Sequence, residues 1–362
     1  MKRPAPQPEH WNSFEENDRQ FYRIPVTIQE DQEISFTIAQ VLAEQFEVQD
    51  VLARGGGGII LKATDKYSKA NLFIKGIVKY DLERENLEEP VEEIVESIRR
   101  SRHHLQTERR ILVQLNNEGC RAVPKIINYV YDVNHSLTDI RKTLDEQEWS
   151  FDDQDIYRSE PYLIMNPVPG MALDRLLNEY FPNGMNWNIA IQIIDQIAEV
   201  IEILHQPIQL EEEIQWNLIY QDLKPGNIIV DEYGHATLLD FGGCQLIVNE
   251  TVVLAGSHSP GYCAPECSGN SGNSEGITAS ADCFGLGTTL FHMLSGVNPQ
   301  TLVPANRAKD DPKAVQFNID LLKSHCPNSF VPFLLKCLSW NAEDRFQSIH
   351  ELRENLHLIE NK

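Results

Sequence analysis

Residues 220–227 read Tyr-Gln-Asp-Leu-Lys-Pro-Gly-Asn, and Asp-Phe-Gly follows at residues 240–242. Short apolar runs at 228–230 and 237–239 separate the two motifs and predict a small hairpin that brings them together. Four polar side chains of different chemistry stand in these turns: Asp222, Lys224, Asn227 and Asp240. Phosphoryl transfer needs such a set: one carboxylate orients the attacking hydroxyl, an ammonium offsets phosphoryl charge, and an amide with a second carboxylate holds magnesium.

These motifs resemble the catalytic loop and the metal-binding loop of the eukaryotic-type (bacterial-style) serine/threonine protein kinase family. The resemblance covers about residues 46–355. It implies an α+β, two-lobed fold, with a small, mainly β N-lobe carrying one main helix and a larger, mainly α C-lobe. We therefore expect a polar N-terminal extension at 1–45, an N-lobe at 46–165, a hinge at 166–170 and a C-lobe at 171–362.

Composition narrows the function classes further. The 362 residues carry a formal net charge of −23, which argues against general nucleic-acid binding and makes a basic or neutral substrate easier to attract than an acidic one. We find no signal peptide and no apolar run of about eighteen residues, so we expect neither secretion nor membrane spanning. Seven cysteines, an odd number, favour reduced thiols and a cytoplasmic setting.

Local patterns agree with the two-lobed expectation. Strands are predicted at 46–52, 59–63, 72–75, 125–131 and 161–165, the first two forming a hairpin with a glycine tip. Helical periodicity runs from Val91 to Leu115, and it returns at 189–205, 281–295, 330–339 and 349–358. We expect the extension to be mobile at its Pro-rich start and docked near its end, with a short strand or helix around Phe36. The acidic stretches 132–160 and 206–217 are predicted as solvated loops.

In the expected N-lobe, Gly55 and Gly58 belong to a glycine cluster that would let backbone N–H groups approach the phosphates of ATP. Ala53 stands where the family has its first glycine. The resemblance places Lys75 as the lysine that pairs with phosphate, supported by Glu108 on the following helix, and it adds Ile60 as a further nucleotide contact. The span from Lys75 to Glu108 is longer than the family usually shows, so we expect an extended helix or extra structure before it.

The adenine side of the site carries one departure from the family. Phe73 stands where the family has a small alanine against the purine, so it would either crowd the base or stack at its edge; a local shift of the strand would remove this conflict. At the hinge, Met165 is the expected gatekeeper. The Asn166 carbonyl and the Val168 amide are the expected adenine contacts, and Ile229 is the expected contact from the C-lobe.

In the catalytic loop, the resemblance makes Asp222 the acceptor of the substrate hydroxyl's proton and Lys224 the contact to the γ-phosphate. Asn227 and Asp240 are the expected magnesium ligands. Gln221 replaces the arginine that in many kinases binds a phosphorylated activation loop, which makes this a non-RD catalytic loop. An amide cannot pair with phosphate as a guanidinium does, so activation by loop phosphorylation is disfavoured.

Supporting residues complete the resemblance. Ser259 stands where serine/threonine kinases place a hydroxyl between the catalytic Asp and Lys. Asp282 matches the buried carboxylate beneath the catalytic loop, and Arg345 matches the partner of Glu266 in an Ala-Pro-Glu segment. Buried carboxylates must be paired, so we expect both to be structural.

The resemblance thus implies a transferase: a cytoplasmic serine/threonine-protein kinase that uses ATP and Mg²⁺ to phosphorylate a protein. Two alternatives remain open at this point. A pseudokinase that only binds or scaffolds is supported by Phe73, Ala53 and Gln221. A kinase for small molecules or peptides shares the Asp222-to-Asn227 spacing, but such enzymes normally lack the Ala-Pro-Glu segment and the lysine at position 224. The substrate, the activating signal and the oligomeric state do not follow from the sequence.

Overall fold

The structure is a computed structural model, and its contacts divide the chain into two compact units. The first comprises residues 1–113 and 125–167, and the second comprises residues 114–124 and 168–362. The structure describes residues 11–16, 18–29, 32–55, 58–77, 91–133, 159–211, 214–248, 251–254, 258–268, 277–302, 317–322 and 326–360. The Pro-rich start and most of the acidic stretch 132–160 lie outside these ranges, so the predictions made for them stay predictions.

A six-stranded antiparallel sheet, in the order β4-β5-β6-β7-β9-β8, is the framework of the first unit. Its strands are β4 (Val41–Leu42), β5 (Phe46–Gly55), β6 (Gly58–Asp65), β7 (Asn71–Gly76), β8 (Ile126–Val133) and β9 (Ser159–Met165). Gly55 pairs with Gly58 at the end of the β5–β6 hairpin. The predicted strands of the N-lobe and the glycine tip of the first hairpin are therefore confirmed.

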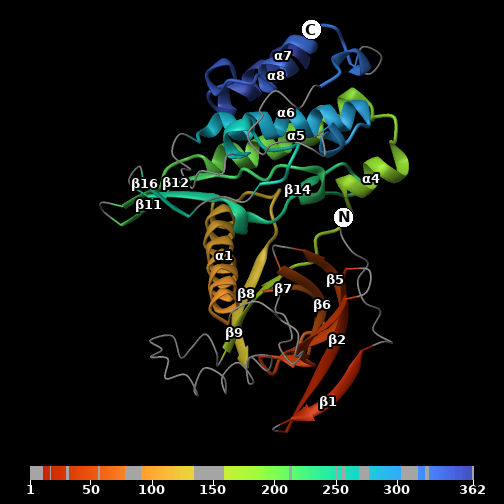
Figure 1. Ribbon diagram of the computed structural model, residues 1–362, viewed down its shortest axis with the longest axis vertical. Helices are drawn as coiled ribbons and strands as arrows, with labels where there is room; N and C mark the ends of the chain where they lie inside the picture. The colour runs from red at the N-terminus through yellow and green to blue at the C-terminus, as the bar shows by residue number, and fades with distance from the viewer. Residues whose placement is uncertain are drawn as a thin grey trace. The chain divides into compact units, whose positions relative to one another are not determined.

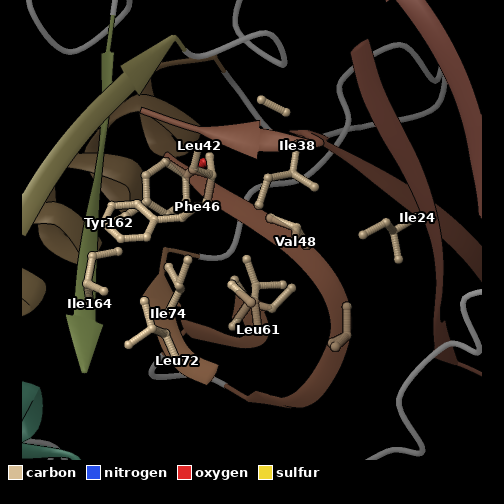
Figure 2. Packing of buried hydrophobic residues seen from close by; sticks show 14 of the residues in the cluster. Ile24, Ile38, Leu42, Phe46, Val48, Leu61, Leu72, Ile74, Tyr162 and Ile164 are labelled. Atoms are coloured by element: carbon tan, nitrogen blue, oxygen red, sulfur yellow. The ribbon is translucent and has the colours of Figure 1, made fainter. Parts of the chain in front are cut away.

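The segment predicted as a polar extension contains a second sheet. This sheet has three antiparallel strands in the order β1 (Asn12–Glu16), β2 (Arg19–Gln29) and β3 (Gln32–Ala39). The expectation of a single short strand or helix near Phe36 was therefore incomplete. Side chains of this sheet, Phe21, Ile24 and Ile38, join the buried cluster of the larger sheet (Figure 2). Burial of these apolar side chains, which polar neighbours obscure in the sequence, orders the segment.

A partly buried ion pair joins this N-terminal sheet to the larger sheet of the same unit. The guanidinium of Arg19 donates to both carboxylate oxygens of Asp132 in β8, at 2.7 and 2.9 Å, and to the carbonyl of Val41 at 3.1 Å. The backbone N–H of Ala43 donates to the same carboxylate at 2.7 Å. The buried Asp132 therefore accepts hydrogen bonds from two other segments and ties β2 and the turn at Ala43 to β8.

The long helix α1 (Val91–Asn117) begins sixteen residues after Lys75 and confirms the predicted helical period. Within the first unit, Arg102 donates to the carbonyl of Ser159 in β9 at 2.8 Å. The guanidinium of Arg109 lies 4.9 Å from the ring centre of Tyr129 in β8, a cation–π contact. These two contacts orient α1 on the sheet. Its 27 residues agree with the expected extended helix, and residues 78–90 lie outside the described ranges.

Several α-helices lie in the second unit, and all but the first of them agree with the predicted helical segments. They are α4 (Leu173–Tyr180), α5 (Trp187–Leu204), α6 (Ala279–Ser295), α7 (Val331–Cys337) and α8 (Ile349–Glu360). Figure 1 shows α5 and α6 side by side, with α7 and α8 packed against them. Helix α6 is buried nearly all round, as its continuous apolar sequence predicts. Together with the first unit's sheet, these helices confirm the expected α+β class.

Two small sheets complete the second unit. One has the order β10-β13-β14, with β10 (Met171–Ala172), β13 (Ile228–Val230) and β14 (Ala236–Leu238). The other has the order β11-β12-β15-β16, with β11 (Ile208–Glu211), β12 (Ile214–Ile219), β15 (Gln245–Val248) and β16 (Thr251–Leu254). Short 3₁₀ helices occur at Pro225–Asn227, Phe241–Gly243, Pro265–Ser268, Pro299–Leu302, Ile319–Leu322 and Ala342–Asp344.

The prediction of a solvated loop at 206–217 was wrong. Strands β11 and β12 form an antiparallel hairpin there, and β12 pairs with β15. The alternation of apolar and polar residues in Ile-Gln-Leu-Glu at 208–211 carries the strand signal, and the three consecutive glutamates at 211–213 concealed it. None of the helices in the described ranges is both long and apolar enough to cross a membrane.

Candidate active site

One buried carboxylate holds the backbone at the start of the catalytic loop, residues 220–227. Asp282, fully buried in α6, accepts hydrogen bonds from the backbone N–H groups of Tyr220 at 2.8 Å and Gln221 at 2.7 Å. Its Oδ2 also lies 2.8 Å from Nε2 of His205. The predicted support of the loop by Asp282 is confirmed, whereas His205 was not singled out from the sequence.

Asp222, Lys224 and Ser259 form a triangle of hydrogen bonds. The ammonium of Lys224 donates to Oδ2 of Asp222 at 2.5 Å and to Oγ of Ser259 at 2.7 Å, and the Ser259 hydroxyl donates to Oδ1 of Asp222 at 2.6 Å. Ser259 comes from a segment 35 residues downstream of Lys224, so the predicted bridge is confirmed. Both oxygens of Asp222 therefore accept hydrogen bonds from ammonium or hydroxyl donors, which fix the direction of the carboxylate.

The two expected magnesium ligands meet across the hairpin β13–β14. The backbone N–H of Leu239 donates to the carbonyl of Asn227 at 2.8 Å, which places Asp240 beside the end of the catalytic loop. Nδ2 of Asn227 donates to the carbonyl of Asp222 at 2.9 Å and to its Oδ2 at 3.2 Å. Because the amide nitrogen is committed to Asp222, the amide oxygen is the atom of Asn227 that can coordinate a cation. One carboxylate and one amide oxygen fit magnesium, which usually keeps phosphate and water among its ligands.

Asp240 has a backbone conformation that few residues adopt. Its φ of 63° and ψ of 69° are left-handed, a conformation that costs free energy for any residue other than glycine. The following Phe241 is fully buried and packs edge-on against the ring of Tyr220, with ring centres 5.6 Å apart. This packing holds the strained turn in place, so the Asp240 carboxylate is preorganised.

In the first unit, Lys75 and Glu108 form a buried ion pair. Nζ of Lys75 lies 2.6 Å from Oε2 of Glu108, and both side chains are less than a tenth exposed. The predicted pairing between β7 and α1 is therefore confirmed. Ile60 lies directly opposite Lys75 in the β6–β7 ladder, so the two side chains share one face of the sheet. A fixed ammonium beside an apolar side chain is suited to a nucleotide, which combines phosphate with an apolar base.

Gly58 has a structural explanation that involves no ligand. Its φ is +130°, and a Cβ atom there would lie 2.4 Å from the carbonyl oxygen of Gly76. Any other residue would therefore force β6 away from β7. Gly55 is the last residue of β5 and the ladder partner of Gly58. Residues 56–57 at the glycine tip lie outside the described ranges.

The expected adenine contacts lie on either side of the boundary between the two units. Asn166 follows the buried gatekeeper Met165 and donates its backbone N–H to the carbonyl of Lys125 at 2.9 Å. Val168 begins the longer of the two segments of the second unit. Half-buried Ile229 lies in β13, opposite Ala172 of β10.

Phe73, the departure noted in the sequence, lies directly opposite Met165 in the β7–β9 ladder. The residue is half-buried, and it stands two positions before Lys75 on the same face of β7. The strand is regular at this point, since Phe73 to Gly76 pair in continuous register with β9. The local strand shift that would have removed Phe73 from this face is therefore not present.

Arg345 and Glu266 form the other predicted ion pair, which lies in the second unit. The guanidinium of Arg345 is fully buried and binds both oxygens of Glu266, at 2.7 and 2.8 Å. It also donates to the carbonyls of Ser339 at 2.7 Å and Trp340 at 2.8 Å. One side chain thus joins the Ala-Pro-Glu segment to the loop between α7 and α8.

Replacing Arg345 by Ala is expected to lower the free energy of unfolding by about 3 kcal/mol or more, because Glu266 and several buried carbonyls lose their donor. Urea denaturation of both proteins measures the difference. An Arg345→Lys variant should recover only part of the loss, since an ammonium cannot bind both carboxylate oxygens and the carbonyls together. Full recovery in that variant would contradict the bidentate role.

A buried Tyr–His pair lies beside the active-site segment and was not found from the sequence. The hydroxyl of Tyr262 lies 2.7 Å from Nδ1 of His292 in α6 and donates to Oδ1 of Asn298 at 3.2 Å. Burial lowers the pKa of His292 to about 4, against a small opposing effect of the Asp174 carboxylate. His292 is thus uncharged at neutral pH. No local pattern marks these residues, because they are thirty positions apart in the sequence.

This pKa predicts a loss of stability in mild acid. The unfolded chain binds a proton at His292 below about pH 6.5, whereas the folded chain resists until about pH 4, so stability is complete above the unfolded pKa and falls as the pH drops. Between about pH 7.5 and about pH 5, the wild type should lose about 2 kcal/mol more than a His292→Gln variant in urea denaturation. The control is His235→Gln, which replaces an exposed histidine and should lose as much stability as the wild type. Equal losses of stability in the wild type, His292→Gln and His235→Gln would refute the low pKa assigned to His292.

A model of the protein kinase domain family matches residues 46–357. The chain belongs to this family. The match begins at the first residue of β5 in this kinase domain and ends within α8, so the sheet β1–β3 precedes it.

Several known kinases are similar to this kinase domain over part of its length. The cAMP-dependent protein kinase catalytic subunit of Arthrobotrys oligospora is 33% identical over 140 residues, which are 38% of this chain and 23% of that protein. The mouse catalytic subunit PRKX is 34% identical over 139 residues, 38% of this chain and 34% of that protein. The serine/threonine-protein kinase PknB of Mycobacterium tuberculosis is 25% identical over 212 residues, 56% of this chain and 30% of that protein.

These matches therefore span about a quarter to a third of the lengths of the relatives. Among solved structures, the crystal structure of the Mycobacterium tuberculosis PknI kinase domain is similar with a TM-score of 0.49 and 16% identity. That match covers 88% of this chain and 96% of the PknI chain.

Proposed function

We propose that this kinase domain is an active enzyme that transfers the γ-phosphoryl group of Mg-ATP to serine or threonine hydroxyls of a protein. The triangle of Asp222, Lys224 and Ser259 carries the proposal, because it assembles an acceptor for the hydroxyl proton beside a cation for the phosphoryl group. A protein that had lost catalysis would have no need to keep these groups together.

In the proposed reaction Asp222 orients the substrate hydroxyl and accepts its proton. Lys224 contacts the γ-phosphate, and its charge offsets the negative charge that spreads over the transferring group. Magnesium, held by Asn227 and Asp240, would neutralise phosphate charge when bound. Lys75, oriented by Glu108, would contact the remaining phosphates, with Gly55 and Gly58 leaving the backbone accessible to them.

The nucleotide base would be held at the hinge. The carbonyl of Asn166 and the N–H of Val168 would bind the adenine edge, while Ile60 and Ile229 would contact its faces. Phe73 stays on the face of β7 that carries Lys75, so we expect it to contact the base edge and to alter base preference relative to kinases with alanine there.

A protein substrate, rather than a small molecule, is supported by the Ala-Pro-Glu segment and its Arg345 partner. Serine/threonine specificity is supported by Lys224 and Ser259, and by the names of the relatives, which include a serine/threonine-protein kinase. The net charge of −23 makes a basic protein the first substrate to try.

The test is transfer of label from γ-labelled ATP to a mixture of basic proteins, with magnesium and with chelator, followed by analysis of the labelled amino acids. We expect magnesium-dependent labelling of serine or threonine. Failure to bind a fluorescent ATP analogue under either condition would refute an enzyme and favour a scaffold. Label found only on small molecules would favour the small-molecule alternative.

A further inference from the structure

Gln245 is fully buried at the first position of β15, in the segment that follows Asp-Phe-Gly. It is the ladder partner of Ile219, the last residue of β12, so it lies next to the start of the catalytic loop. Its Oε1 accepts a hydrogen bond from Nε2 of Gln221. The proposed kinase mechanism gives Gln245 no role, although it contacts the residue directly before Asp222.

Gln221 is held at both of its ends. Its backbone N–H donates to the buried Asp282 at 2.7 Å, and its side chain, only 5% exposed, donates to Gln245. Its φ of 63° is left-handed, which is costly for a residue with a Cβ and persists only where neighbouring contacts over-determine it. Asp222 follows immediately, so the backbone from which the Asp222 side chain extends is set by this strained residue.

The sheet around these two glutamines keeps them together. Strands β12 and β15 pair continuously from Ile219 with Gln245 to Trp216 with Val248. The hairpin strand β11 extends the sheet on one side and β16 extends it on the other. In the segment after Asp-Phe-Gly, residues 245–248 are thus ordered by backbone pairing with the hairpin that precedes the catalytic loop, and residues 251–254 pair with them in turn.

We propose that Gln245 is a positioning residue for phosphoryl transfer: acting through Gln221, it fixes the orientation of Asp222. This inference rests on the proposed function. Both amides are uncharged, so their contact requires no phosphate on the activation segment. The hairpin β11–β12 and the Gln221–Gln245 pair together supply the order that a phosphate bound by arginine would otherwise provide.

The test compares a single and a double replacement by methionine, which is close to glutamine in size. In Gln245→Met the buried amide of Gln221 loses its acceptor, and an unpaired buried amide forces its neighbours to rearrange. We expect kcat to fall about tenfold, with the KM for ATP within about twofold of the wild type. In the double variant Gln221→Met/Gln245→Met the loss of kcat should be no larger than in Gln245→Met, because both replacements remove the same hydrogen bond.

A matched control separates positioning from general stability. Gln196 in α5 also makes two hydrogen bonds across its unit, to the carbonyl of Gly234 and from the N–H of Ala236, both at 3.0 Å. Gln196→Met should lower the melting temperature about as much as Gln245→Met but leave kcat within about twofold of the wild type. If Gln245→Met likewise lowers the melting temperature and leaves kcat unchanged, Gln245 is only structural and the inference is overturned.

Two further measurements complete the test. Phosphatase treatment of the wild type, verified by mass spectrometry, should leave kcat unchanged. Loss of activity would overturn the claim that the ordering of Asp222 requires no phosphate on the activation segment. Hydrogen exchange of a peptide covering 217–224, which contains the Asp222 N–H bonded to the Tyr220 carbonyl at 2.9 Å, should quicken in Gln245→Met and to a similar degree in the double variant.

The exchange measurement does not depend on catalysis, so the two proposals fail separately. An inactive wild type that still shows this exchange pattern would refute the proposed function and leave the positioning intact. An active wild type whose exchange and kcat are indifferent to Gln245→Met would refute the positioning alone.

Discussion

Replacing Asp222 by Asn is expected to reduce turnover about 10³-fold, while binding of a fluorescent ATP analogue stays unchanged. Asparagine has nearly the same shape and keeps one oxygen that can accept the Lys224 or Ser259 hydrogen bond. It cannot, however, accept the proton of a substrate hydroxyl at neutral pH. The large loss is therefore expected in kcat rather than in nucleotide affinity. Initial rates of label transfer measure the first quantity, and fluorescence titration measures the second.

The same chemical change elsewhere in the second unit is the control for this prediction. Asp231 lies in the turn between β13 and β14, where its carboxylate accepts hydrogen bonds from the N–H groups of Tyr233 and His235. Asp231→Asn should keep turnover within about twofold of the wild type. Label transfer by Asp222→Asn within tenfold of the wild-type rate would show that Asp222 does not accept the proton.

Replacing Lys75 by Met should lower kcat/KM about 10²-fold or more, because charge placement provides most of the rate enhancement in phosphoryl transfer. The same change leaves the buried Glu108 carboxylate without its ammonium partner. We therefore also expect the free energy of unfolding to fall by about 3 kcal/mol. Label transfer and urea denaturation are the two measurements.

Two companion variants separate these effects. Glu108→Gln keeps the size of the side chain and removes its charge, so it should lower activity through a misplaced Lys75 while costing less stability than Lys75→Met. Lys62→Met removes an exposed lysine from the neighbouring strand β6 and should change neither quantity. Unaltered kcat/KM in Lys75→Met would refute the phosphate role of this lysine, and unaltered stability would refute the cost of leaving Glu108 unpaired.

Much of the candidate site could be predicted because its spacing is local. Asp222, Lys224 and Asn227 lie within six residues, and the apolar hairpin that follows them has a strong strand signal. The pairs Lys75–Glu108 and Glu266–Arg345 join residues far apart in sequence. They could be predicted only because the family resemblance supplied the register of each partner.

The sheet β1–β3 and the hairpin β11–β12 were missed for a common reason. Both segments are rich in polar and charged residues, and alternation in a short polar strand is a weak signal by itself. Burial against the larger sheet stabilises the first of them, and backbone pairing with β15 stabilises the second. Phe21 packs with the core of the six-stranded sheet, and Trp216 stands opposite Val248 in the ladder with β15.

The sequence alone predicted the family, the two-lobed fold and the residues proposed to carry the chemistry, because phosphoryl transfer demands particular side chains at nearly fixed spacing. Tertiary structure alone decided the surroundings of those residues: the partner of Gln221, the support of Asp282 by His205, and the neutral His292 beside Tyr262. Such contacts depend on burial and on strand register, and a glutamine or histidine has many candidate partners until packing brings one of them within hydrogen-bond distance.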